Sequence, residues 1–150
     1  MKYEHFKVEM KYKIAHVAFN RPEKSNALHM EAWLEMKSIF ETLSTTDEAR
    51  VIVLSGEGKH FCAGIDLELL MSVGEYQKVS CSARRSEKIR KLVQTLQNAI
   101  TYIEKCSKPV LAAVHNGCIG GGVDIVTACD MRYCSEDAYF TIKEIDLGMV

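Results

Sequence analysis

The chain has 150 residues, of which 47% are hydrophobic, and its 19 basic residues nearly balance 20 acidic ones for a net charge of −1. This length and composition predict one globular domain over residues 1–150 with a substantial core. The balanced charge excludes a global field that favours nucleic acid or anionic lipid, and no apolar run approaches membrane-spanning length.

The first third of the chain is predicted to form two strands, a helix and a third strand. Phe6, Val8 and Met10 alternate with charged neighbours, and Val17 with Phe19 continues the pattern after a break, which predicts a β-hairpin. A loop over 21–26 follows. It leads to apolar residues at helical spacing, namely Met30, Trp33, Met36, Phe40 and Leu43. A short buried strand is predicted over 51–54.

The rest of the chain is predicted to alternate helices with strands. A long amphipathic helix spans the apolar positions from Ile89 to Ile103, and a strand over 110–115 follows it. A helix over 123–129, a strand over 131–134 and an extended piece over 139–142 come next. The order β-β-α-β-α-β-α-β predicts an α/β layer fold with right-handed crossovers.

The six cysteines form no C-x-x-C pair and have no histidine at metal-ligand spacing, so no metal site is expected. They are predicted to be reduced, buried thiols: Cys62, Cys81, Cys106, Cys118, Cys129 and Cys134. The polar N-terminus does not resemble a secretory leader. These features together predict an intracellular, reducing compartment, which is the cytoplasm in a bacterium and the mitochondrion or peroxisome in a eukaryote.

Basic residues cluster in one short stretch, which holds Arg84, Arg85, Lys88, Arg90 and Lys91. On a helix they form a solvated face. A nucleic-acid patch is the alternative, but no aromatic residues interleave with them as a base-stacking groove requires. We therefore expect neither nucleic acid nor a membrane as a partner.

Three consecutive glycines, Gly120 to Gly122, separate an apolar strand from a helix. Without Cβ atoms, their backbone N–H groups can approach a ligand closely, and the helix adds the positive end of its dipole. Such a junction favours a developing negative charge. Asp124 in the helix and Glu144 after the next apolar segment can handle protons beside that charge, which points to chemistry on an enolate.

A second strand-to-helix junction, over 60–67, follows the strand 51–54 as the glycines follow the strand 110–115. Two such junctions can face one pocket, and each can contribute one backbone N–H to an oxyanion hole. A thioester carbonyl is a suitable occupant, because its α-proton becomes removable only when such donors hold the enolate oxygen.

Each of these features also has a purely structural explanation. The glycines can serve a tight turn and close helix packing, Asp124 can be a dipole partner, Glu144 a surface carboxylate and Asp66 the first residue of a helix. His60 and His115 lie near the two junctions without a Ser or Cys partner in a recognisable motif, so we expect a core or rim position for both.

Several motifs occur together along the chain: Arg21-Pro22 through Asn26-Ala27-Leu28, His60-Phe61-Cys62-Ala63-Gly64-Ile65-Asp66-Leu67, Cys118-Ile119-Gly120-Gly121-Gly122-Val123-Asp124, Ala128-Cys129-Asp130-Met131-Arg132 and Lys143-Glu144-Ile145-Asp146-Leu147-Gly148. In combination they resemble the enoyl-CoA hydratase/isomerase (crotonase) superfamily. The resemblance runs from the first strand to the last residue. It implies a crotonase-like fold of β-β-α repeats with a spiral core, whose C-terminal helical part this chain lacks.

The resemblance also implies an acyl-CoA thioester as the substrate, with no metal and no further cofactor. The family's oxyanion hole carries over onto the backbone N–H groups of Ile65 and Gly121, and its two acid/base positions onto Asp124 and Glu144. The residues implied to line the acyl-CoA site are Ser25, Ala27, Ala63, Gly64, Ile65, Asp66, Leu67, Gly121 and Gly122.

Within the superfamily, Gly-Gly-Gly-Val-Asp with Lys-Glu-Ile-Asp is more similar to the dienoyl-CoA isomerases, because hydratases usually carry Glu at both acid/base positions. The implied activity converts a 3,5-dienoyl-CoA to the 2,4-dienoyl-CoA through a dienolate. The alternatives are a 2-enoyl-CoA hydratase and a non-catalytic or RNA-associated binding protein. The family's further catalytic Asp and its C-terminal helices, which form a homotrimer or a dimer of trimers, would follow Val150, so the domain is expected to be incomplete at its C-terminus.

Overall fold

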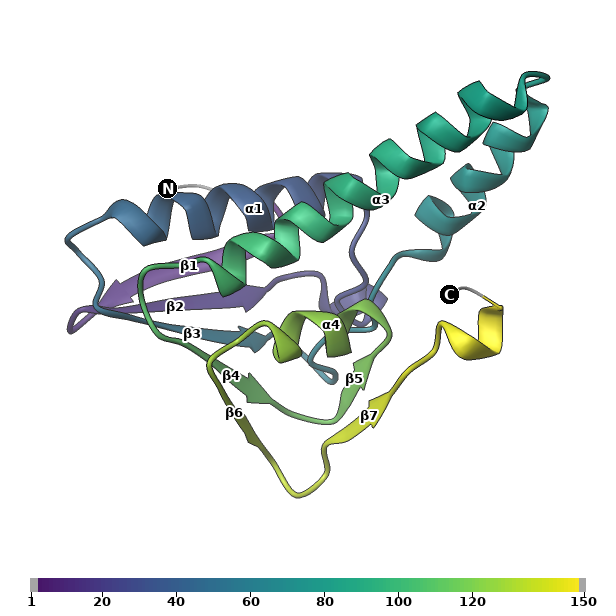
Figure 1. Cartoon of the computed structure of the whole chain (residues 1–150). Helices are drawn as coiled ribbons and strands as arrows, with labels where there is room; N and C mark the ends of the chain where they lie inside the picture. Colours follow the sequence, from purple (N-terminus) through teal and green to yellow (C-terminus); the bar gives the residue numbers. More distant parts are fainter. Residues whose placement is uncertain (1–2, 149–150) are drawn as a thin grey trace.

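The computed structural model describes residues 3–148, apart from the side chains of Gln77 and Leu147. Its centre is a five-stranded sheet in the order β1-β2-β3-β4-β6 (Figure 1). β1 and β2 pair antiparallel, whereas β2, β3, β4 and β6 run parallel to one another. The strands span β1 Phe6–Lys11, β2 Ile14–Phe19, β3 Val51–Gly56, β4 Val110–Val114 and β6 Met131–Cys134.

A second, smaller sheet and four α-helices complete the described part of the chain. The small sheet pairs β5 (Gly117–Ile119) in parallel with β7 (Tyr139–Thr141). Helices α1 and α3 cover one face of the large sheet, while α2 and the N-terminal part of α3 extend beyond it (Figure 1). The helices span α1 Met30–Thr45, α2 Leu67–Glu75, α3 Ser82–Glu104 and α4 Gly121–Thr127. Single 3₁₀ turns lie at Pro22–Lys24, Tyr76–Lys78 and Ile145–Leu147.

The apolar stripe predicted for α1 is buried against the sheet. Trp33, Met36, Phe40 and Leu43 are each at most 1% exposed. They belong to one core cluster with the inward-facing residues of the central strands, among them Val17, Phe19, Ile52, Leu54 and Val110. Burying each large apolar side chain contributes roughly 1.5–3 kcal/mol. This layer therefore holds α1 firmly against the parallel strands, and the candidate site lies beyond the ends of these strands.

The chain repeats one spatial pattern of a strand in the large sheet, a partner in the small layer and then a helix. After β2, Leu28 bridges Ile65, and after β3, Cys62 bridges Cys118 of β5, both in parallel. β4 is followed by β5 and α4, and β6 by β7 and the last 3₁₀ turn. This arrangement confirms the α/β class and the expected β-β-α repeats.

Two expectations about the elements were wrong. The expected element order had one helix between the strands at 51–54 and 110–115, although a helix start was also expected at Asp66; the structure has both α2 and α3 there. α2 has nine residues and none of them is fully buried, although Leu69 packs against the core while partly exposed. The strand at 110–115 was expected to run directly into the glycines, but β4 ends at Val114, Asn116 adopts a φ of 47° and β5 begins a new sheet.

The cysteines are only partly as expected. Cys62, Cys118 and Cys129 are buried and Cys106 is half-buried, but Cys81 and Cys134 are exposed. Cys81 precedes the part of α3 that extends beyond the sheet, and Cys134 lies in β6, an edge strand whose residues are all exposed. Burial raises the pKa of the Cys62, Cys118 and Cys129 thiols to about 12. In residues 3–148, no helix has the length and apolar character to span a bilayer.

Candidate active site

The glycine run forms the turn between β5 and α4. Gly120 has a φ of 52°, a left-handed conformation that side chains rarely adopt. A Cβ atom at Gly120 would lie 2.9 Å from Oε1 of Glu144, so the absence of a side chain lets this carboxylate approach the turn. The Glu144 carboxylate, a predicted acid/base group, therefore lies close to the start of α4.

The second junction lies directly against the first. Gly64 has a φ of 80°, and a Cβ atom there would lie 2.6 Å from the carbonyl oxygen of Ile119 and 2.8 Å from the amide nitrogen of Gly121. The Ile119 amide also donates a hydrogen bond to the carbonyl of Cys62 at 2.9 Å. The structure thus brings together the two junctions that the sequence analysis predicted to share a pocket.

The amide of Ile65 points away from its neighbouring segment. The Leu28 amide donates to the Gly64 carbonyl at 2.8 Å, and the Asp66 amide donates to the Leu28 carbonyl at 3.0 Å. In extended backbone, successive N–H groups point to opposite sides. The Ile65 N–H therefore faces away from Leu28.

The amide of Gly121 is the first of α4 and has no partner within its helix, as expected for a first-turn donor. Across residues 3–148, neither this amide nor that of Ile65 has a hydrogen-bond acceptor. A Cβ atom at Gly121 would lie 3.6 Å from Cγ1 of Ile65 and 3.3 Å from the Trp33 ring. Two adjacent donors are therefore left free, one in the buried Gly121 and one in the half-buried Ile65, although backbone donors away from water are usually paired.

These groups line one small cavity of about 80 Å³. Ile65, Gly121 and Glu144 all contribute to its wall, so three of the four residues predicted for the chemistry meet there. The other lining residues are Ala63, Leu67, Leu70, Gly120 and Lys143. Lys143 forms an ion pair with Asp146 at 2.6 Å, across the turn that carries Glu144.

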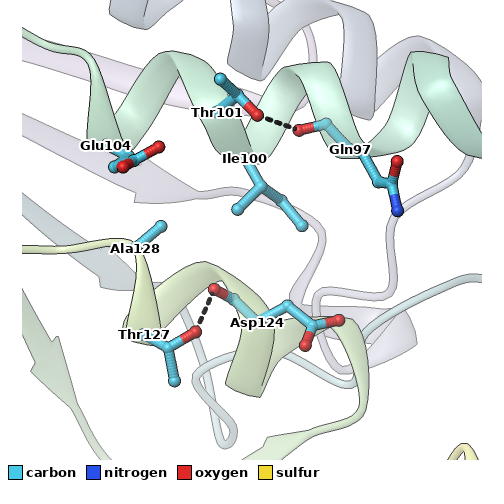
Figure 2. Close-up of a pocket in the computed structure, with 7 residues that line it drawn as sticks. All are labelled: Gln97, Ile100, Thr101, Glu104, Asp124, Thr127 and Ala128. Atoms are coloured by element: carbon cyan, nitrogen blue, oxygen red, sulfur yellow. Dashed lines mark hydrogen bonds between the residues drawn. The ribbon is translucent and has the colours of Figure 1, made fainter.

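Asp124 lies one helical turn away and lines a different cavity. This groove of about 620 Å³ runs between α3 and α4, where Asp124 lies opposite Ile100 and Gln97, and Glu104 lies opposite Thr127 and Ala128 (Figure 2). Partial burial and, to a lesser degree, the negative charge of Glu144 raise the pKa of Asp124. The two carboxylates therefore interact electrostatically, but they do not line one common cavity in the described part of the chain.

The residues predicted to bind acyl-CoA through the two loops border a groove of about 470 Å³, lined by Lys24, Ser25, Ala27, Ala63, Ile65, Asp66, Leu67 and Glu68. This groove shares Ala63, Ile65 and Leu67 with the small cavity, so the two are adjoining. Gly64 and Gly122 do not line it. A Cβ atom at Gly122 would lie 2.8 Å from the Cys62 carbonyl, which indicates a packing role for this glycine.

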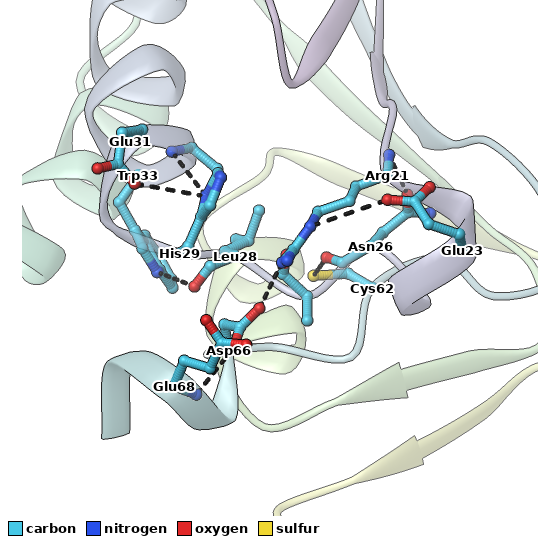
Figure 3. Close-up of polar contacts among 12 residues, drawn as sticks. Arg21, Glu23, Asn26, Leu28, His29, Glu31, Trp33, Cys62, Asp66 and Glu68 are labelled. Carbon is cyan, nitrogen blue, oxygen red and sulfur yellow. Dashed lines mark hydrogen bonds and ion pairs between the residues drawn. The ribbon is translucent and has the colours of Figure 1, made fainter. Parts of the chain in front are cut away.

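Arg21 and Asn26, which the sequence analysis named in a motif but gave no role, hold the loops in place (Figure 3). Asn26 is 1% exposed, and its side-chain amide donates to the carbonyls of Glu57, His60 and Phe61 at 2.8 to 3.2 Å. Arg21 forms an ion pair with Asp66 and also donates to the Ala27 carbonyl at 3.0 Å. Of these residues, only Asp66 had a signal in the sequence, because an Asp before an apolar run is typical of a helix start.

Asp66 caps α2, which bears out its structural interpretation. Its carboxylate accepts a hydrogen bond from the Glu68 amide at 2.9 Å. Hydrogen bonding from Arg21 is the main cause that lowers the pKa of Asp66.

His60 and His115, the histidines near the two junctions, form contacts with turns. The Gly117 amide donates to His60 Nδ1 at 3.3 Å, and His115 Nε2 lies 3.0 Å from the Gly58 carbonyl.

The basic stretch lies on the part of α3 that extends beyond the sheet. Glu87 pairs with both Arg90 and Lys91, at 2.9 and 3.5 Å. One aromatic residue from outside the stretch does reach it, since Lys88 Nζ lies 6.0 Å from the Tyr76 ring centroid. Among residues 3–148, no three His, Cys, Asp or Glu side chains are grouped so that they could hold a metal ion.

Comparison with known proteins identifies relatives of this fold and these motifs. A dienoyl-CoA isomerase of Arabidopsis thaliana, named Delta(3,5)-Delta(2,4)-dienoyl-CoA isomerase, peroxisomal, is 49% identical over 138 residues, which cover 91% of this chain and 50% of the relative. The mitochondrial isomerase of that name from Homo sapiens is 47% identical over 148 residues, covering 98% and 45%. This chain therefore spans about half the length of these curated relatives.

A solved structure has the same architecture. The crystal structure of an enoyl-CoA hydratase/carnithine racemase from Magnetospirillum magneticum superposes with a TM-score of 0.82 at 26% identity, covering 99% of this chain and 53% of the other. The family model described as enoyl-CoA hydratase/isomerase matches residues 9–150. The chain belongs to the enoyl-CoA hydratase/isomerase family.

Proposed function

We propose that the full-length protein isomerises a 3,5-dienoyl-CoA to the corresponding 2,4-dienoyl-CoA. The observation that carries this proposal is the pair of adjacent, unpaired amides of Ile65 and Gly121 beside the Glu144 carboxylate. The names of the relatives at 47–49% identity support the choice of reaction within the family.

The thioester oxygen would accept hydrogen bonds from both amides. In the ground state this oxygen carries only a partial charge, whereas removal of the C2 proton makes it an enolate oxygen. Donors that are fixed before the reaction stabilise the enolate more than the thioester, and each is worth roughly 10²–10³ in turnover. The oxidation state of the substrate does not change along this route, so the route calls for no redox cofactor.

Glu144 would act as the base at C2. Proton removal leaves a dienolate that is delocalised from the thioester oxygen to C6. Protonation at C6 then moves both double bonds one position toward the thioester, so the atoms of substrate and product balance. The raised pKa of Asp124 keeps its proton to higher pH than that of an ordinary aspartate, which suits a proton donor.

The groove along Ser25, Ala27 and Ala63 to Leu67 would hold the CoA moiety. It adjoins the small cavity, so the thioester could lie at the amides while the CoA occupies the groove. Lys24 at the groove wall offers a positive charge to a phosphorylated ligand. An acyl-CoA is therefore the partner that we propose for this surface.

The separate cavities of Asp124 and Glu144 favour isomerisation over hydration. A hydratase needs one water held between two acids, whereas isomerisation needs protons handled at two distant carbons.

Glu87 neutralises part of the basic stretch on α3, so an RNA-associated function is not proposed. We further propose a mitochondrial or peroxisomal location in a eukaryotic source, as the names of the relatives suggest. A trimer or a dimer of trimers stays a prediction from the resemblance, which sedimentation would test.

The test compares kcat/KM of the full-length protein for a 3,5-dienoyl-CoA and for a 2-enoyl-CoA. Formation of the conjugated 2,4-dienoyl product is followed by its new ultraviolet absorbance, and hydration by loss of enoyl absorbance. We expect a ratio that favours isomerisation by at least about tenfold, since the two substrates differ in transition-state binding. A ratio that favours hydration would replace the isomerase proposal by the hydratase alternative.

A further inference from the structure

We propose that Arg21 is a positioning residue for the Ile65 amide and acts through Asp66 and the carbonyl of Ala27. This inference rests on the proposed function, in which that amide binds the thioester oxygen. Arg21 does not line the acyl-CoA groove or the small cavity. Its effect on turnover would therefore be indirect.

Arg21 joins the two segments between which Ile65 is held. Its Nη1 donates to the Ala27 carbonyl at 3.0 Å and pairs with the Asp66 carboxylate (Figure 3). Ala27 precedes Leu28, which pairs with the backbone on both sides of Ile65, and Asp66 directly follows Ile65. One guanidinium thus fixes the spacing of both segments next to the amide.

The backbone of Arg21, from which the guanidinium extends, is itself held in place. The Arg21 amide donates to Oδ1 of Asn26 at 2.9 Å, and the Asn26 amide donates to the Arg21 carbonyl at 2.9 Å. Asn26 is buried and donates to three backbone carbonyls of the segment after β3. The start of the Arg21 side chain therefore cannot move without breaking a buried hydrogen-bond network.

The Arg21–Asp66 pair is largely shielded from water, which distinguishes it from the other pairs in the described part of the chain. The side chains of Arg21 and Asp66 are 20% and 10% exposed, whereas those of Arg90 and Glu87 on α3 are 57% and 44% exposed. A buried, hydrogen-bonded pair is geometrically rigid, and exposed pairs contribute little. The ion pair thus suits a positioning role more than a general contribution to surface charge.

The geometry predicts a specific kinetic effect. Without the guanidinium, the Ile65 segment can shift relative to the Gly121 amide, and the two donors no longer converge on one oxygen. A displacement of about 1 Å between a donor and the reacting group lowers turnover by up to roughly 10²-fold. We expect Arg21→Met to lower kcat about 10- to 100-fold with a smaller rise in KM, of at most about tenfold, because Ala27, Ile65 and Asp66 also line the groove.

The test uses the full-length protein and the 2,4-dienoyl-CoA product with a ¹³C-labelled thioester carbonyl. Infrared difference spectra report how far the bound carbonyl stretch falls below that of the free ligand, which measures polarisation by the two amides. We expect a clear downshift in the wild type, a downshift reduced by at least about half in Arg21→Met, and an intermediate value in Arg21→Lys. The matched control Arg90→Met, which removes an exposed Arg–Glu pair, should keep the wild-type spectrum.

The outcomes separate this inference from the proposed function. A wild type without a downshift would overturn the oxyanion hole itself. A wild-type downshift that persists in Arg21→Met, with only a lower melting temperature, would overturn the positioning role alone. If Arg21→Met does not fold, Asp66→Asn gives the same readout, because the amide oxygen can still cap α2 while the ion pair is lost. Double replacement should lower kcat no further than the worse single variant, and additive losses would contradict a joint action.

Discussion

Replacing Gly64 by alanine tests how closely the two junctions must pack. The new Cβ atom would lie 2.6 Å from the Ile119 carbonyl oxygen and 2.8 Å from the Gly121 nitrogen, both backbone atoms. Reaching ordinary contact requires the junctions to separate by roughly 0.6–0.8 Å. The φ of 80° adds strain of about 1–2 kcal/mol for a residue with a side chain. We therefore expect the free energy of unfolding to fall by about 2–3 kcal/mol.

The same separation moves the Ile65 amide away from the Gly121 amide, so kcat should fall by about 10²-fold while KM changes little. Isomerisation is followed by product absorbance, and stability by urea titration, at a temperature where the variant is folded. Gly74→Ala is the matched control, since nothing lies within 4 Å of its new Cβ atom and the site is helical. The free energy of unfolding of this control should rise by about 0.5–1 kcal/mol, and its turnover should equal that of the wild type. A folded Gly64→Ala variant with kcat within threefold of wild type would refute the reasoning.

Three further predictions concern the acids and the core. Glu144→Gln should lower turnover by about 10²–10⁴-fold with acyl-CoA affinity unchanged, and near-normal turnover would remove Glu144 from the mechanism. The pKa of Asp124 is raised in the folded state, so ionisation of this carboxyl lowers the free energy of unfolding as the pH rises through that pKa. Asp124→Asn should therefore raise the free energy of unfolding at neutral pH but not at acidic pH, as measured by urea titration. Trp33→Phe removes the hydrogen bond to the Leu28 carbonyl and should cost about 1–2 kcal/mol in the same titration; an unchanged midpoint would contradict this.

Local pattern was sufficient to predict most of the large sheet and the helices on it. The apolar spacing of Trp33, Met36 and Phe40 identified α1, because that face is buried against the strands. The spacing did not identify α2, which is short and buries no residue fully, although Leu69 packs against the core. β5 was missed because three residues, Gly117–Ile119, are too few for an alternation to be recognised, and its pairing with β7 joins segments far apart in the sequence.

The candidate site was predicted in its parts more than in its arrangement. The motifs at 60–67 and 118–124 indicated two junctions in one pocket, and the structure places Gly64 against Gly121. The Arg21–Asp66 pair joins residues 45 positions apart, and no local pattern reports such a contact. The placement of Asp124 beside α3 likewise depends on how α3 and α4 pack, so its separation from the cavity of Glu144 was not predicted.

A crystal structure of the full-length protein with bound 2,4-dienoyl-CoA tests the central claim most directly. The account predicts that the thioester oxygen lies about 2.7–3.1 Å from both the Ile65 and the Gly121 amide nitrogens. It also predicts that the Glu144 carboxylate lies over C2 of the acyl chain. A thioester oxygen that contacts neither amide, with the acyl chain bound elsewhere, would contradict the account.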